Sequence, residues 1–318
     1  MQDGRATILI GFDGSAQAED AIRCAGRLLA PRRAIVAHVW ESLAELVLPS
    51  DVYHVAGPMT EAADELDAED RREAEIVAAR GADLAEEAGF DAVPVAARGR
   101  PKAWPTLLEL AEQHEAAAVV VGSRGLSGVK SALLGSVSSG VLDHAHLPVL
   151  IVPPVDERAA PGPVVIGYDG SEHSDAAVRA AGRLLKVRET ILQTVWVSHQ
   201  AVSPVGLVGA PVVVVSKAAE EIDRAVREAT ERVADQGARL AAAQGLEVKA
   251  EAVHGDGPSW RTLLTTAHAH RAAAVVVGSR GKSALGAALV GSVSRALVHH
   301  APAPVLVVRP PAGSAARP

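Results

Sequence analysis

The amino-acid sequence predicts an α/β protein that contains two tandem copies of one domain, each built on an open parallel sheet. Landmark residues recur after 156 positions: Asp169 follows Asp13, and Pro304 follows Pro148, at this same interval. In each copy, short apolar runs alternate with helix-like segments, which is typical of a parallel sheet covered by helices on both faces. The interval is too long for a solenoid repeat and is close to a whole domain. The chain is therefore expected to be a tandem duplication.

The elements of the first copy follow from local signals. Residues 6–12 form a strand-like run, and the Asp13-Gly-Ser15 turn then places Ser15 as the N-cap of a helix that ends near residue 29. The remaining predicted elements are a strand over 34–40, a helix over 61–88, a strand over 92–98, a helix over 102–115, a strand that ends at Val121, a helix over 136–145 and a strand over 148–152. The second copy repeats this series from residues 164–168 to residues 304–308. About five strands are thus expected in each copy.

The segment 154–163 is polar and rich in proline, which predicts a linker. It would separate a first domain, residues 1–153, from a second domain, residues 164–310, with a flexible tail at 311–318. The two copies differ most after their second strand, where the second copy carries the apolar stretch 207–215. This stretch is either a flap packed on its own sheet or a contact surface for a partner.

Charge and composition limit the classes of function. The chain has 318 residues and a formal net charge of −7, which argues against a nucleic-acid or anionic-membrane surface. Aromatic residues make up only 3% of the chain, so Ala, Val, Leu and Ile must fill the cores. The single cysteine, Cys24, excludes an internal disulfide and corresponds to Ala180, as expected of a small buried residue. The sequence shows neither a basic apolar leader nor an apolar run long enough to span a bilayer, so a cytoplasmic protein is expected.

A glycine–serine loop follows the fourth strand of each copy. The first loop reads Gly122-Ser-Arg-Gly125, then nine residues, then Gly135-Ser136, and the second loop keeps this pattern from Gly278 onward. Glycines permit positive φ and let the backbone approach an oxyanion closely. The Gly-Ser pair opens a helix whose free amides and dipole favour phosphate. The repeated spacing predicts a phosphate site in both copies.

Three parts of each copy converge at the carboxyl ends of the strands, where open parallel sheets bind their ligands. Asp13 and Asp169 end the first strands, where a carboxylate can accept hydrogen bonds from ribose hydroxyls. Val39 and Val195 end the second strands and can line an adenine pocket. The loop supplies the phosphate contacts, with Ser138 expected to be one of its hydroxyl donors.

The chain resembles the universal stress protein family, in its tandem two-domain form, over nearly its whole length. The resemblance rests on the opening strand with Asp-Gly-Ser, the loop that continues as Val-Ser, and the closing Pro-Val-Leu strand. It implies the strand order 3-2-1-4-5 and one ATP per domain, with Mg²⁺ held mainly by phosphate oxygens. In the first half it assigns adenine and ribose contacts to Gly11, Phe12, Asp13, Val39 and Val121, and phosphate contacts to Gly122, Arg124, Gly125, Gly135, Ser136, Val137 and Ser138. The matching residues of the second half are Gly167, Tyr168, Asp169, Val195, Val277, Gly278, Arg280, Gly281, Gly291, Ser292, Val293 and Ser294.

Other motifs do not fit the sequence. The run Gly281-Lys-Ser has Val276 where a Walker A loop needs glycine, and no Rossmann glycine pattern follows the first strand. Of the histidines near the last helix, only His144 recurs, as His300, so no zinc site is expected. No general base or paired carboxylate recurs beside the loop, which argues against fast ATP hydrolysis.

The sequence favours an ATP-binding regulator of a stress response, with one nucleotide site per domain and a partner that the sequence does not identify. The alternative is a slow ATPase, or an enzyme that phosphorylates its own Ser136 or Ser138. A tandem module that has lost its nucleotide is the least favoured, because both loops are intact. The apolar last strands would be exposed edges, and the resemblance implies a pseudo-twofold pair of domains within the chain and a homodimer of chains.

Overall fold

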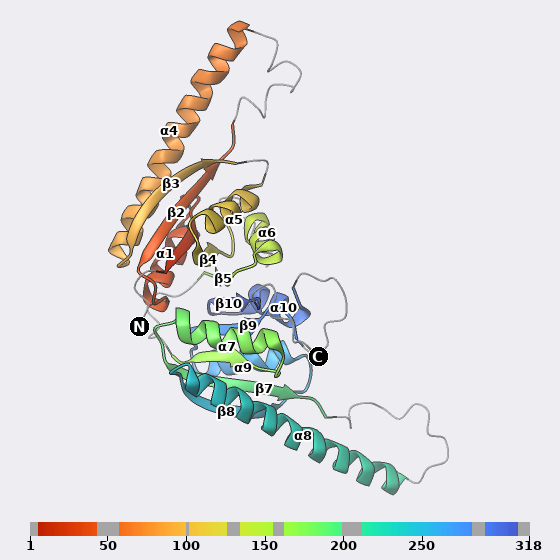
Figure 1. The fold of residues 1–318 in the computed structure, drawn as a ribbon. Coiled ribbons are helices and arrows are strands. Elements are labelled where there is room, and N and C mark those ends of the chain that lie inside the picture. Colours follow the sequence, from red (N-terminus) through yellow and green to blue (C-terminus); the bar gives the residue numbers. More distant parts are fainter. Residues whose placement is uncertain are drawn as a thin grey trace. The chain divides into compact units, whose positions relative to one another are not determined.

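The computed structural model describes residues 6–42, 57–99, 102–125, 134–154, 162–198, 212–281 and 290–310. The chain divides into two compact units, Met1–Glu157 (unit 1) and Arg158–Pro318 (unit 2), and each unit alternates strands and helices (Figure 1).

Unit 1 is a five-stranded parallel sheet with the order β3-β2-β1-β4-β5. Its elements are β1 (Thr7–Gly11), α1 (Ala16–Leu28), β2 (Arg33–Trp40), α4 (Gly57–Glu87), β3 (Asp91–Arg98), α5 (Ala103–Gln113), β4 (Ala116–Gly122), α6 (Ser136–His144) and β5 (Val149–Val152). The predicted α/β class and the strand order 3-2-1-4-5 are confirmed.

Unit 2 repeats this topology as β8-β7-β6-β9-β10, again with parallel neighbours. Its elements are β6 (Val164–Gly167), α7 (Glu172–Leu184), β7 (Glu189–Trp196), α8 (Val212–Ala243), β8 (Glu247–His254), α9 (Ser259–Ala269), β9 (Ala274–Gly278), α10 (Ser292–His300) and β10 (Val305–Val308). In both units the strand order reverses beside the first strand, between β1 and β4 and between β6 and β9.

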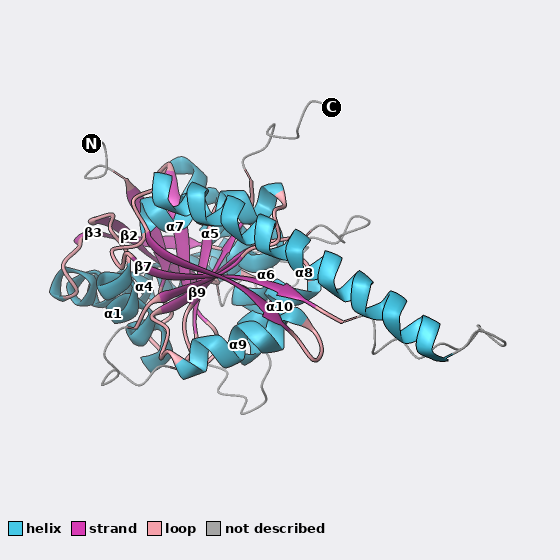
Figure 2. Cartoon of the chain, turned by 90° about the horizontal axis from the view of Figure 1, so that it is seen from below, coloured by secondary structure: helices cyan, strands magenta, loops and turns pink. Residues whose placement is uncertain are grey.

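Helices cover both faces of each sheet (Figure 2). In unit 1, α1 lies against β4 and β5, α4 lies against β2 and β3, and these two helices contact each other. The opposite face carries α5, which packs on β1, β2 and β4 and contacts α6. In unit 2, α7 and α8 cover one face of the sheet, and α9 and α10 cover the other face. The central strands are consequently buried on both faces: Ile8, Leu9 and Ile10 of β1 have no exposed surface.

The turn after the first strand forms as the sequence predicts. The carboxylate of Asp13 accepts a hydrogen bond from the Ser15 amide (3.0 Å), and the Ser15 hydroxyl oxygen accepts one from the Ala18 amide (3.2 Å), which caps α1. Gly14 lies between them with φ of 79°, a conformation that glycine adopts without a steric penalty. Asp169, Gly170 and Ser171 repeat the same turn and cap in unit 2.

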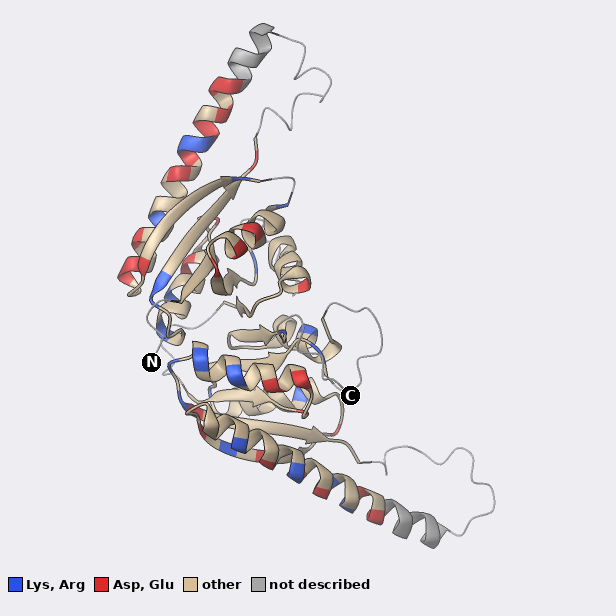
Figure 3. Ribbon diagram, in the orientation of Figure 1, with Lys and Arg blue, Asp and Glu red and all other residues tan. Residues whose placement is uncertain are grey.

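Helix α4 has a narrow buried stripe and a long charged face. The stripe consists of small residues one turn apart, Ala74, Ala78, Ala82 and Ala85, which let the helix lie close to β2 and β3. The rest of α4 carries mostly acidic side chains with a few basic ones among them (Figure 3). Arg71 and its i+4 partner Glu75 are 2.9 Å apart and both are exposed, as expected of an ion pair on a solvated helix face.

Cys24 is buried on α1, and burial raises the pKa of its thiol to about 12. Within the described parts of the chain, no helix is both long and apolar enough to cross a bilayer. The predicted flap at 207–215 lies mostly outside the described residues, as do most of the predicted linker and the tail at 311–318.

Candidate functional site

Each unit has a cavity at the carboxyl ends of its central strands. The cavity of unit 1 measures about 200 Å³ and lies where β1, β2 and β4 end beneath the first turns of α5 and α6. It brings together all twelve residues that the sequence assigns to this half: Gly11, Phe12, Asp13, Val39, Val121, Gly122, Arg124, Gly125, Gly135, Ser136, Val137 and Ser138. These residues come from four elements and from two loops that are more than 100 positions apart in the sequence.

The cavity of unit 2 occupies the equivalent place and measures about 350 Å³. It also gathers the twelve residues assigned to this half: Gly167, Tyr168, Asp169, Val195, Val277, Gly278, Arg280, Gly281, Gly291, Ser292, Val293 and Ser294. Both cavities lie at the point where the strand order reverses, the usual ligand position in this type of sheet.

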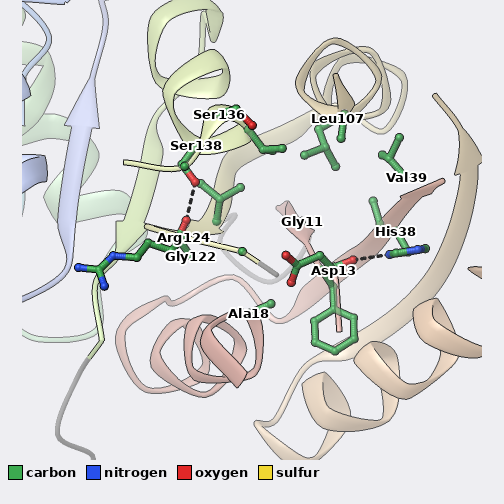
Figure 4. A pocket seen from close by; sticks show the side chains of 17 residues that line it. Gly11, Asp13, Ala18, His38, Val39, Leu107, Gly122, Arg124, Ser136 and Ser138 are labelled. Atoms are coloured by element: carbon green, nitrogen blue, oxygen red, sulfur yellow. Dashed lines mark hydrogen bonds between the residues drawn. The ribbon is translucent and has the colours of Figure 1, made fainter. Parts of the chain in front are cut away.

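The unit 1 cavity has an apolar end and a polar end (Figure 4). Val39 and Leu107 lie at the apolar end, with His38 beside them; Gly122 and Ser138 lie at the other end. The Nδ1 atom of the His38 ring forms a 2.8 Å hydrogen bond with the Phe12 carbonyl oxygen. An elongated ligand with one flat apolar part and one anionic part matches this division.

Two repeated hydrogen bonds fix the glycine–serine loop. The Ser138 hydroxyl donates to the Gly122 carbonyl oxygen (2.6 Å), and the Gly135 amide donates to the Ser123 carbonyl oxygen (2.9 Å). In unit 2, the Ser294 hydroxyl bonds the Gly278 carbonyl in the same way, also at 2.6 Å. A hydroxyl has a single proton to donate. In this arrangement Ser138 anchors the loop through the Gly122 carbonyl, and its role as a donor to a phosphate stays a prediction.

The loop glycines serve close packing rather than positive φ, which corrects the sequence-based argument. Neither Gly122 nor Gly125 has positive φ. A Cβ atom at Gly122 would lie 2.8 Å from the Gln17 side chain of α1, so a glycine is needed for the strand to approach this helix. A Cβ atom at Gly125 would collide with a carboxylate oxygen of Asp13. The two glycines therefore hold the loop against α1 and against the Asp13 carboxylate.

The polar end of each cavity is formed by an uncapped helix N-terminus. Gly135 is the N-cap of the nine-residue helix α6, and Gly291 that of α10, and neither helix has a side-chain cap. The first-turn amides of Ser136, Val137 and Ser138 have no intrahelical acceptor, and the helix dipole places partial positive charge there. Such a terminus can bind an anion.

The arginine of the loop differs between the two units. In Figure 4 the Arg124 side chain extends away from Val39 and Leu107 at the apolar end. In unit 2, the Nε atom of Arg280 is buried and has no hydrogen-bond partner within the described residues, while the residue lines the cavity. A buried N–H donor without an acceptor is costly, so an anionic ligand would relieve this cost.

The cavities also include residues that the sequence reasoning did not identify. In unit 1 they are Ala18, Ala37, His38, Ala103 and Leu107, and in unit 2 they are Ser174, Gln193, Ser259, Leu263 and Val290. Leu107 and Leu263 are equivalent positions on α5 and α9, and their recurrence after 156 residues was an available signal. The sequence did not show that α5 and α9 pack over the strand ends, and this packing is what brings the two leucines to the cavities.

Each cavity contains one acidic residue among the described residues that line it. Asp13 and Asp169 are the acidic residues among the lining residues. Across the described residues, no group of three or more His, Cys, Asp or Glu side chains is placed to hold a metal ion.

A tandem parallel α/β protein with a glycine–serine loop beside a cavity in each half is the class that this fold and these cavities define. The chain belongs to the universal stress protein family, whose model matches residues 4–153 and 162–309. A universal stress protein from Mycolicibacterium smegmatis is 31% identical over 308 residues, which cover 95% of this chain and 97% of that protein. One from Mycobacterium tuberculosis is 34% identical over 214 residues, 65% of this chain and 62% of that protein. The crystal structure of a universal stress protein from Archaeoglobus fulgidus shares the fold, with a TM-score of 0.60 at 23% identity over 97% of this chain and 98% of that chain.

Proposed function

We propose that each unit binds one adenine nucleotide, which is ATP, and that the protein is a regulator rather than an efficient enzyme. The observation that supports this most is the shape of the cavity: an apolar end, a carboxylate at its centre and an uncapped helix N-terminus at its polar end. These parts suit a base, a ribose and a phosphate chain in that order. Some members of the universal stress protein family bind ATP, which agrees with the proposal.

In this proposal the residues have separate roles. Val39 and Leu107 contact the base, the Asp13 carboxylate accepts hydrogen bonds from the ribose, and the amides that follow Gly135 hold the phosphates. Arg124 adds a positive charge to the loop, and Mg²⁺ accompanies the phosphates. Unit 2 repeats these roles, with Val195, Leu263, Asp169, Gly291 and Arg280 in the equivalent places.

The test uses a negative charge at the start of the helix. Ser136 is exposed and lines the cavity, so Ser136→Glu places a carboxylate where the phosphates would lie. The helix tolerates the change, because an acidic residue in the first turn interacts favourably with the dipole. Titration calorimetry of the wild-type chain should give two ATP per chain, Ser136→Glu one, and Ser136→Glu combined with Ser292→Glu none.

The matched control is Ser139→Glu, which adds the same charge to α6 at a position that does not line the cavity. It should keep two ATP per chain. Undiminished binding by the double variant would show that the phosphates lie elsewhere, and a wild-type chain that takes up no adenine nucleotide would refute the proposal.

Regulator and enzyme differ in turnover. A regulator should release phosphate from ATP no faster than buffer does, and its serines should stay unmodified in the intact mass of the chain. Steady release that Ser136→Glu and Ser292→Glu abolish together would instead favour the slow ATPase. The cytoplasmic location, the pairing of the two units and the homodimer stay predictions. A light-scattering mass of 32.7 kDa, that of one chain, would contradict the dimer.

A further inference from the structure

The two cavities differ at their apolar ends. Residue 37 of unit 1 is Ala37, and the equivalent residue of unit 2 is Gln193, which is only 1% exposed. Both line their cavities, and both pair in register with the last glycine of the neighbouring strand, Gly11 or Gly167. A glutamine carboxamide thus stands in the interior of unit 2 where unit 1 has a methyl group.

A second substitution accompanies the first. The Gln193 side-chain Nε2 donates a 2.8 Å hydrogen bond to the Thr266 hydroxyl on α9. The residue of α5 that corresponds to Thr266 is Leu110, which is buried. Unit 1 therefore has an apolar pair, Ala37 and Leu110, where unit 2 has a hydrogen-bonded polar pair. The polar pair holds the carboxamide in one place.

The other end of this carboxamide is the Oε1 oxygen. Within the described residues, Gln193 Oε1 is buried and accepts no hydrogen bond. Two other side chains of the same cavity do have hydrogen-bond partners: the Tyr168 hydroxyl donates to Asp175 (2.7 Å), and the Ser174 hydroxyl donates to the Ser171 carbonyl oxygen (2.8 Å). A buried carbonyl oxygen without a donor destabilises the folded state, and a donor carried by a ligand would remove this cost.

We propose that Gln193 makes the unit 2 cavity more selective than the unit 1 cavity for a base that carries an exocyclic amino group, through an N–H···Oε1 hydrogen bond. This inference rests on the proposed nucleotide function and adds a difference between the two sites. The physical reason is that a site built to pair with a polar group rejects a ligand that lacks it, because its own buried group then stays unpaired. An apolar surface makes no such distinction.

The test compares ATP with purine riboside triphosphate, which lacks the amino group but keeps the ring, the ribose and the phosphates. Each cavity is measured separately in the full-length chain: unit 2 in the Ser136→Glu background and unit 1 in the Ser292→Glu background. In unit 2, ATP should bind about five- to tenfold more tightly than the analogue. In unit 1, where Ala37 takes the place of Gln193, the ratio should be smaller.

Two further variants tie the selectivity to this side chain. Gln193→Met keeps the length of the side chain and removes the acceptor, and it should reduce the unit 2 ratio to about one. Ala37→Gln combined with Leu110→Thr introduces the polar pair into unit 1 and should create a preference there. The second variant tests the inference even if the first does not fold.

The outcomes separate the two proposals. If neither background binds any nucleotide, the proposed function fails. If both bind ATP but the ratio in unit 2 is one, or is unchanged by Gln193→Met, the function stands and the role of Gln193 is wrong. A unit 2 preference for inosine triphosphate, which has a carbonyl oxygen in place of the amino group, would also overturn the proposed pairing of Gln193 with that amino group.

Discussion

At the scale of the residue, close contacts rather than backbone flexibility explain why glycines occupy the loop. A Cβ atom at Gly278 would lie 2.6 Å from a backbone carbon of His173, at the start of α7. At Gly291 the nearest atom would be 3.3 Å away, and φ there is −70°. The two glycines of one loop are thus under different constraints, although the sequence alone presents them as equivalent.

This difference predicts different costs for the same substitution. Gly278→Ala should lower the free energy of unfolding by about 1–3 kcal/mol, because α7 must shift to make room. Gly291→Ala, the matched control, should change it by less than about 1 kcal/mol. Urea denaturation of both variants is the measurement, and equal costs would contradict the packing role given to Gly278.

At the scale of the element, local signals determine the turn after each first strand. The Asp-Gly-Ser sequence supplies an acceptor for the Ser15 amide, a residue suited to positive φ and a helix cap, each within three positions. Such short-range chemistry can be read from the sequence, and the predicted helix starts agree with the structure.

The cap can be tested by substitution and rescue. Ser15→Ala removes the oxygen that accepts the Ala18 amide and should destabilise unit 1 by about 1 kcal/mol. Ser15→Asp restores an acceptor at the same position and should recover most of the loss. Thermal unfolding followed by circular dichroism gives the comparison. A loss that Ser15→Asp does not recover would mean that the serine acts through something other than the cap.

Interactions between elements were harder to predict than the elements themselves. The repeated spacing identified the loop, but the sequence did not indicate that Ser138 would bond the Gly122 carbonyl, 16 positions away. It also left Leu107 and Gln193 unidentified, because neither has a motif and both reach the cavity only through the packing of α5 and α9 on the strands.

At the scale of the whole molecule, two copies of one fold have kept the same cavity plan with different linings. If each unit binds its own nucleotide, ATP should stabilise each unit separately. At a concentration 100-fold above the dissociation constant, the stabilisation is about 2.7 kcal/mol per site, and the unfolding temperature should rise by roughly 5–10 °C.

Scanning calorimetry of Ser136→Glu with and without ATP examines this directly. The unfolding temperature of unit 2 should rise while that of unit 1 stays unchanged. If the two units unfold in one overlapping transition without ATP, that transition should separate into two when ATP is added. In the wild-type chain both should shift together. If ATP moved the whole transition of Ser136→Glu as far as that of the wild type, the two sites would not be independent.

The sequence by itself determined the duplication, the α/β class, the order of the elements and the residues of the two loops, because these depend on periodicity and on contacts between near neighbours. Only the tertiary structure decided which glycines are needed for packing, which serine hydroxyl donates within the protein, and which glutamine oxygen is buried without a donor among the described residues. Each of these depends on atoms brought together from distant parts of the chain, and such distances are fixed only when the helices pack on the sheet.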